Sequence, residues 1–217
     1  VRLMDKIGAG ETGRSLAGGA VGSFVMKSGA SVAAFLLSIL LARTLGADGY
    51  GEFVYAMSWI YLLTIPALLG FDRLMLREIP VLEQQQNWSK LHGLLRFSQG
   101  AVVGLSLVIA GGVAWAAWRT QQSSSQEEQL LTSALLIAML LLPAYSFLRL
   151  RQTILLAKKK YITAQVGELL ILPWGTLLLL AGVALIQLDV LTVEAALYAH
   201  LIAGLAGIIY LLIASRG

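Results

Sequence analysis

Ionisable residues that interrupt long apolar runs are the positions in this 217-residue sequence at which chemistry could occur. Glu168 lies about two turns into an apolar run that begins at Tyr161. A carboxylate at that depth could pair with a cation in helix packing, with Lys27, Arg149 or Arg151 as the partner. It could also bind H+ or Na+, or act as a gate. The sequence leaves both interpretations open.

Lysine and arginine residues beside the apolar runs form a second group of candidates. The planar fork of arginine suits a phosphate group, whereas lysine acts as a point charge. Each could instead anchor a helix end or form a salt bridge there. The candidate anion-binding residues are Lys27, Arg43, Arg73, Arg77, Arg149 and Arg151. The candidate coupling or gating residues are Glu168, Asp72 and Glu78.

Enzyme signatures are poorly represented in the sequence. His92 and His200 belong to different segments, and neither a His-Glu-x-x-His zinc pattern nor a Gly-x-Ser-x-Gly elbow occurs. Gly8–Ser15 has the spacing of a phosphate-binding loop with Arg14 in place of lysine, but seven preceding residues cannot supply the strand such a loop needs. We therefore predict no enzyme, no metal and no cofactor. We expect His200 to pack or hydrogen-bond between helices, and His92 to lie in a solvated loop.

The composition is that of an integral membrane protein. Apolar residues make up 58% of the chain, charged residues 13%, and the mean hydropathy is +0.77. Soluble domains contain about 45–50% apolar and about 25% charged residues. Cysteine is absent, which excludes disulfides and thiolate chemistry. The basic residues punctuate apolar runs and form no groove-sized face, so nucleic-acid binding is not expected.

The lengths of the apolar runs predict an all-α, polytopic membrane protein. About twenty helical residues cross a hydrocarbon core of about 30 Å, and backbone in lipid must be helical. A cytoplasmic leader is expected over residues 1–21, before a bundle over residues 22–217. The expected spans are 22–45, 53–71, 97–118, 129–148, 161–188 and 195–215, which makes six transmembrane helices. Gly46, Gly49 and Gly51 fall in the polar turn of the first hairpin.

Two features of these runs suggest a cavity. Lys27, Ser31, Ala34 and Ser38 share one small, polar helical face, which suits close packing or a cavity wall. Prolines at membrane depth suggest bent helices around such a cavity. These prolines are Pro66, Pro143 and Pro173.

Orientation follows from the lysine and arginine content of each side. The leader with Lys27, the second and fourth connections and the tail hold fourteen of the sixteen basic residues. Arg43 and Arg119 lie on the other side. Short cytoplasmic loops are enriched in lysine and arginine, so both termini are expected in the cytoplasm. The triplet Lys158–Lys160 is attributed to this topology and to attraction by anionic lipid.

Two segments carry a family resemblance. Leu40–Phe53 reads LLARTLGADGYGEF, and Leu76–Ile79 reads LREI. Together they resemble the opening of bacterial polysaccharide-biosynthesis membrane proteins, the lipid-linked oligosaccharide flippases of the multidrug/oligosaccharidyl-lipid/polysaccharide exporter superfamily. The resemblance implies that the bundle corresponds to one lobe of a two-lobed flippase. It further implies a transporter that moves polyprenyl-diphosphate-linked oligosaccharide across the bacterial cytoplasmic (inner) membrane, with Lys27 and Arg43 as candidates to meet the diphosphate.

The same resemblance implies the partners. Because the family has two similar bundles, this chain is expected either to be a truncated half with a missing C-terminal lobe or to assemble with a second copy. Membrane lipid and lipid-linked oligosaccharide are the expected ligands, and a glycan polymerase and glycosyltransferases are further expected partners. Two alternatives stay open. One is an exporter of drugs or other lipids from the same superfamily, and the other is a non-transporting scaffold subunit of a glycan-assembly complex.

The orientation can be tested with alkaline phosphatase, which is active only outside the cytoplasm. Fusions within Ser123–Gln126 are expected to be active, because this connection lies on the side with few basic residues. Fusions near Lys159 are expected to be inactive. Activity confined to the Lys159 fusions would reverse the topology.

Overall fold

The computed structural model describes the backbone of residues 2–121, 126–186 and 191–215, and all of its elements there are helical. Side chains are described within 21–119, 132–186 and 191–215. The helices are α1 (Arg2–Leu68), α2 (Phe71–Gln84), α3 (Trp88–Gln121), α4 (Gln126–Ala157), α5 (Tyr161–Val166), a π-helical segment (Gly167–Ile171), α6 (Leu172–Ile186) and α7 (Val193–Ala214). The all-α prediction is confirmed for these residues.

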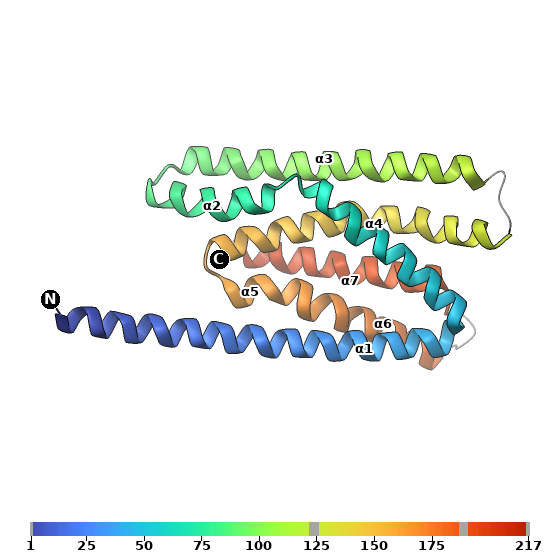
Figure 1. The fold of residues 1–217 in the computed structure, drawn as a ribbon, viewed down its shortest axis with the longest axis horizontal. Helices are drawn as coiled ribbons and strands as arrows, with labels where there is room; N and C mark the ends of the chain where they lie inside the picture. The colour runs from blue at the N-terminus through green and yellow to red at the C-terminus, as the bar shows by residue number, and fades with distance from the viewer. Residues whose placement is uncertain (1, 122–125, 187–190, 216–217) are drawn as a thin grey trace.

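The first hairpin is built within α1, which is broken at a single residue. Gly46 has φ 75° and ψ −176°, a conformation that glycine adopts without steric cost. The chain doubles back at this point, so that two arms of α1 run in opposite directions (Figure 1). The polar turn expected around Gly46, Gly49 and Gly51 is therefore reduced to one non-helical residue, with helix on both sides.

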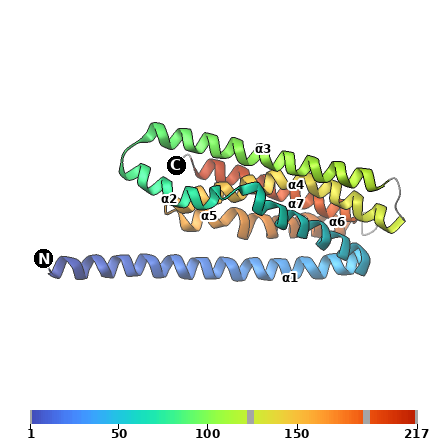
Figure 2. The same ribbon diagram turned by 45° about the horizontal axis from the view of Figure 1, so that its top comes forward.

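Successive long helices run back and forth, as Figures 1 and 2 show. One end of the bundle holds α2, the Lys158–Lys160 turn between α4 and α5, and the C-terminal end of α7; we call it the basic end. The opposite end holds the break in α1, three residues after Arg43, and the last turn of α3, which contains Arg119. The arrangement thus gathers most basic residues of the described connections at one end, as their distribution in the sequence predicts.

Helix lengths and surfaces indicate a multi-pass membrane protein. Among the residues whose side chains are described, five helices are long and apolar enough to cross a membrane: Val21–Leu68, Trp88–Arg119, Thr132–Ala157, Tyr161–Ile186 and Val193–Ala214. Many of their apolar side chains point outward, for example Val108 and Leu185, which are 71% and 88% exposed. An apolar surface of this kind is stable against lipid but not against water.

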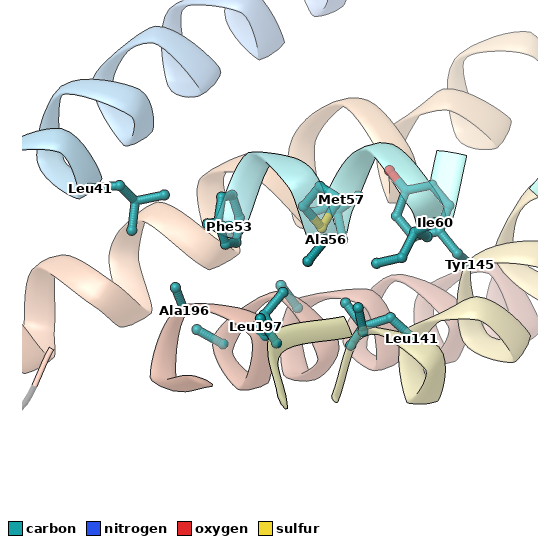
Figure 3. Close-up of a cluster of buried hydrophobic side chains, with 14 of the residues drawn as sticks. Leu41, Phe53, Ala56, Met57, Ile60, Leu141, Tyr145, Ala196 and Leu197 are labelled. Atoms are coloured by element: carbon teal, nitrogen blue, oxygen red, sulfur yellow. The ribbon is translucent and has the colours of Figure 1, made fainter. Parts of the chain in front are cut away.

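The largest buried cluster joins both arms of α1 to α4 and α7 (Figure 3). Phe53 and Ile60 from the second arm meet Leu141 of α4 and Leu197 of α7. Ala56 is fully buried there, and its small side chain suits a close approach between helices. Tyr145 borders the same cluster and projects from α4 toward the second arm.

The π-helical segment packs closely against a glycine of α7. A Cβ on Gly207 of α7 would lie 3.2 Å from the carbonyl oxygen of Gly167 and 3.0 Å from Leu148. Pro173 follows the segment, and its ring would clash with the carbonyl of the residue four positions earlier in a regular helix. The wider turn relieves that clash, so the bend expected near Pro173 takes the form of a π-helical segment.

Several helix ends differ from the sequence-based expectation. α1 begins at Arg2, so the expected leader is helical, and Gly8–Ser15 lies in a helix with no strand among the described residues. α3 begins at Trp88, because the side chain of Asn87 accepts a hydrogen bond from the Lys90 amide at 3.3 Å. Residues 88–96, which precede the span expected from residue 97, are its first turns.

α4 also extends beyond its expected end at residue 148 and continues to Ala157. Leu150 and Ile154 are buried against α2 and α3, and this burial stabilises the additional helical turns. Arg149 and Arg151 therefore lie on a helix, and the connection that follows is only the lysine turn.

The glycine contact can be tested by substitution. Gly207→Ala is expected to destabilise the protein by about 1–3 kcal/mol, since the new Cβ meets backbone and a packed leucine. Gly100→Ala is the matched control, because nothing lies within 4 Å of a Cβ at that exposed glycine of α3. Thermal unfolding in detergent measures both. Equal midpoints for the two variants would contradict the packing described here.

Candidate functional site

A cavity of about 420 Å³, which we call cavity 1, lies between the two arms of α1 and the start of α6. Ala34 and Ser38 line it from the first arm, and Phe53 and Met57 from the second. Two residues of the face expected to form a cavity wall therefore do so. Lys27 and Ser31, the other two residues of that face, are exposed and do not line this cavity. Glu168 lines cavity 1 from the π-helical segment.

A second cavity of about 440 Å³, cavity 2, lies nearer the basic end, where α1 ends and α2 begins. Its wall contains three charged residues, Asp72, Arg73 and Arg149. The left-handed Gly70 (φ 74°) turns the chain from α1 into α2 and so places Asp72 and Arg73 beside the cavity. Cavity 2 thus combines two arginines and one carboxylate from α2 and α4.

Two tyrosines line both cavities. The Tyr145 hydroxyl donates a hydrogen bond to the Tyr61 hydroxyl at 3.4 Å, and the two rings meet edge-on with centroids 5.5 Å apart. Tyr61 comes from the second arm of α1 and Tyr145 from α4. We call these two side chains the tyrosine pair.

An ion pair connects the two cavities at the same level. Arg149 Nη1 donates to Glu168 Oε1 at 2.9 Å, and the exposed fractions of the two side chains are 51% and 20%. Arg149 lines cavity 2, whereas Glu168 lines cavity 1. The ion pair and the tyrosine pair therefore form a polar partition between the cavities. Of the two interpretations of Glu168, pairing with a cation is observed, and the carboxylate faces a cavity as well.

His200 packs between helices, as expected. It is buried beside cavity 1, stacks on Tyr145 at 6.2 Å and meets Phe53 edge-on at 6.4 Å. The Thr176 hydroxyl donates its one proton to the Leu172 carbonyl at 2.7 Å. His200 Nδ1 lies 3.2 Å from that hydroxyl and must therefore be the donor. Nε2 is then an acceptor, and it has no hydrogen-bond partner among the described residues.

His92 also lies where the structure can describe it. Its ring Nδ1 is 2.7 Å from the Trp88 carbonyl, and the side chain is exposed in the first turns of α3. The residue is solvated as expected, but it belongs to a helix and not to a loop.

The other candidate residues line neither cavity. Arg77 and Glu78 form an ion pair at 3.0 Å on α2, with Arg77 76% exposed. Lys27 is exposed, and Arg43 is exposed near the break in α1. Arg151 points elsewhere, donating to Gln99 at 3.3 Å and lying 5.3 Å from the Phe147 ring. The structure therefore brings together Asp72, Arg73, Arg149 and Glu168 out of the nine candidates.

The tyrosine pair was not identified from the sequence. Membrane tyrosines favour the interface, so a tyrosine well inside an apolar run is a signal for a polar contact at depth. Tyr61 and Tyr145 both fit this description. Their pairing across eighty-four positions of sequence could not be read from either run alone.

The described residues contain no group of three or more His, Cys, Asp or Glu placed to hold a metal ion. Comparisons with models of known protein families, with curated proteins and with solved structures give no match. The fold and the two cavities therefore define only a class, a multi-pass helical membrane protein with two cavities whose walls contain polar and charged side chains.

The histidine contact can be tested with Thr176→Val. The variant removes the hydroxyl that accepts from His200, and it is expected to lower the free energy of unfolding by about 1–3 kcal/mol because a buried N–H loses its partner. Ser31→Ala is the control, since that hydroxyl is exposed and bonds only its own helix. Denaturant unfolding in detergent measures both. A Thr176→Val protein as stable as the control would disprove the assigned bond.

Proposed function

We propose that this chain is part of a membrane transporter that translocates polyprenyl-diphosphate-linked oligosaccharide across the bacterial cytoplasmic membrane. The observation that carries the proposal is the pair of cavities on either side of a polar partition. Charged side chains inside a membrane bundle are costly, and they occur mainly where they face one another or a pathway for a polar solute. The substrate class comes from the resemblance of Leu40–Phe53 and Leu76–Ile79 to the flippases.

Six crossings agree with the length of α1. Its apolar part, Val21–Leu68, has 48 residues, which rise about 72 Å as a helix and exceed two hydrocarbon cores of about 30 Å. With the break at Gly46, each arm is long enough for one crossing. Together with the other four apolar helices, the two arms would make the six-helix lobe of a two-lobed flippase.

The positions of the charges support an orientation and an entry side. The basic end would face the cytoplasm by the positive-inside rule. Cavity 2 lies nearer that end, so a lipid-linked diphosphate from the cytoplasmic leaflet would meet Arg73 and Arg149 first. The glycan would pass within the bundle while the polyprenyl tail stays in lipid. Cavity 1 would receive the glycan after the partition opens.

Transport also requires a driving force and an opposing surface. The P-loop-like segment is helical, so the proposed transport is passive or coupled to an ion gradient or the membrane potential. The second lobe or a second copy of this chain would supply the surface against which the bundle rocks.

Leaflet translocation of a labelled lipid-linked sugar tests this function. The full-length gene product is reconstituted in vesicles, and sugar at the outer surface is measured by enzymatic release. Arg149→Gln is expected to slow translocation about tenfold, because it removes a charge-assisted contact to the diphosphate. Arg119→Gln is the matched control, since Arg119 stacks on Trp115 at the opposite end. Translocation no faster than in protein-free vesicles would remove the transport assignment.

A further inference from the structure

We propose that the Arg149–Glu168 ion pair is a latch on the passage between the two cavities, and that a phosphate or diphosphate group entering cavity 2 opens it by drawing Arg149 away from Glu168. The inference rests on the proposed function and adds to it how substrate entry and the opening of the passage are linked. The observations behind it concern three things: where the two partners lie, how strongly they are held and what could replace the bond.

The two partners face different spaces. Arg149 lines cavity 2 beside Arg73, and Glu168 lines cavity 1, so their bond crosses the partition. Both members of the tyrosine pair line both cavities. A bond that joins the two cavity walls restricts movement between the cavities while it is formed, and the tyrosine pair restricts it further.

The bond is weak enough to be exchanged. The Arg149 side chain is half-exposed, and ion pairs with that exposure contribute little net free energy. The tyrosine hydroxyls are 3.4 Å apart, which is long for an O–H···O bond. Both contacts can therefore break without loss of the fold, in contrast with the buried cluster behind them.

A phosphate group is the chemistry that would compete best with Glu168. Guanidinium has five N–H donors, and its fork binds two phosphate oxygens at once. Only one short bond joins Arg149 to Glu168. Arg73 adds a second positive charge to cavity 2, whereas Asp72 in the same wall disfavours small anions without such a fork contact. The long arginine side chain can make this exchange without backbone movement.

The π-helical segment allows the side chain of Glu168 to reorient when Arg149 leaves it. Glu168 lies in this segment, where backbone hydrogen bonds are re-paired from the α-helical pattern. Its neighbour Gly167 is held against Gly207, which fixes the start of the segment while the glutamate side chain remains free to turn into cavity 1. The freed carboxylate would then face the incoming polar group and not the arginine.

The chain has no cysteine, so a single introduced thiol reports on cavity 1 without background. Met57→Cys places the thiol in the wall of cavity 1 and Thr64→Cys places one in the wall of cavity 2, and both positions are buried. A charged, membrane-impermeant thiol reagent is added from the basic end to full-length protein in vesicles of neutral lipid. Inorganic pyrophosphate is the soluble probe.

With the latch closed, Met57→Cys should react more slowly than Thr64→Cys, because a reagent added from the basic end meets cavity 2 first. Pyrophosphate is expected to raise the Met57→Cys rate about fivefold, and adding Glu168→Gln should give that rise without pyrophosphate. Glu78→Gln is the matched control, because it breaks the Arg77–Glu78 ion pair of α2, whose residues line neither cavity. The proposal is overturned if neither pyrophosphate nor Glu168→Gln changes the Met57→Cys rate, or if Glu78→Gln changes it equally.

Binding of pyrophosphate gives a second readout that a purely structural ion pair would not move. Glu168→Gln should bind pyrophosphate about fivefold more tightly than the unsubstituted chain, because the competitor of the phosphate is removed. Arg149→Gln should bind it more weakly. Unchanged or weaker binding by Glu168→Gln would overturn the competition.

Further arms identify the source of the phosphate and separate this inference from the proposed function. Polyprenyl diphosphate in neutral vesicles, and phosphatidylglycerol in place of neutral lipid, are compared with pyrophosphate. Opening by phosphatidylglycerol alone would assign the anion to bulk lipid headgroups, and opening by polyprenyl diphosphate alone to a lipid-linked substrate. If translocation proceeds but the labelling is insensitive to Glu168→Gln, only the latch fails. If the labelling responds but no translocation occurs, only the transport function fails.

Discussion

Backbone hydrogen bonding is the constraint on which the rest of this structure depends. Hydrocarbon offers no partners for N–H and C=O groups, so the apolar runs can only be helices, and any departure from helix must be placed with care. The break at Gly46 lies at an end of the bundle, and the π-helical segment is packed against Gly207 of α7. At both positions, the backbone N–H and C=O groups that lose a helical partner lie either at an end of the bundle or in a tightly packed contact.

The polar partition follows from a second constraint, the cost of charge at membrane depth. Glu168 could not remain isolated among apolar helices, and Arg149 of α4 is its partner. The continuation of α4 to Ala157 makes this possible, because it turns an expected loop arginine into a helical residue whose side chain reaches Glu168. The ion pair also helps to define the two cavities, because it and the tyrosine pair divide a space that the helices leave between them.

Much of the fold could be predicted from the sequence, because the runs near twenty residues admit few other structures. The all-helical architecture, the reversal near Gly46 and a departure from regular α-helix near Pro173 were all foreseeable from local residue types. Helix ends were not, because the extension of α4 depends on burial of Leu150 against other helices. The composition identifies residues of an apolar core, but it does not show at which residue packing stops stabilising further turns of a helix.

The candidate site was only partly foreseeable for the same reason. Glu168 was conspicuous as a carboxylate in an apolar run, and its partner was one of three cations that the sequence could not tell apart. Arg77 and Lys27 looked equivalent to Arg149 by residue type, yet they point away from the cavities. Contacts between helices determine which of these residues line a cavity. The tyrosine pair shows that such a contact can have no clear signal in the sequence of either helix.

The single-residue break in α1 has a mechanical consequence. Cavity 1 lies between two rigid rods that share one pivot, and the two torsion angles of Gly46 set how far apart those rods stand. A few degrees of rotation at the pivot are multiplied along the rods into a larger separation near Ala34. One residue without a side chain thus contributes to the width of the chamber.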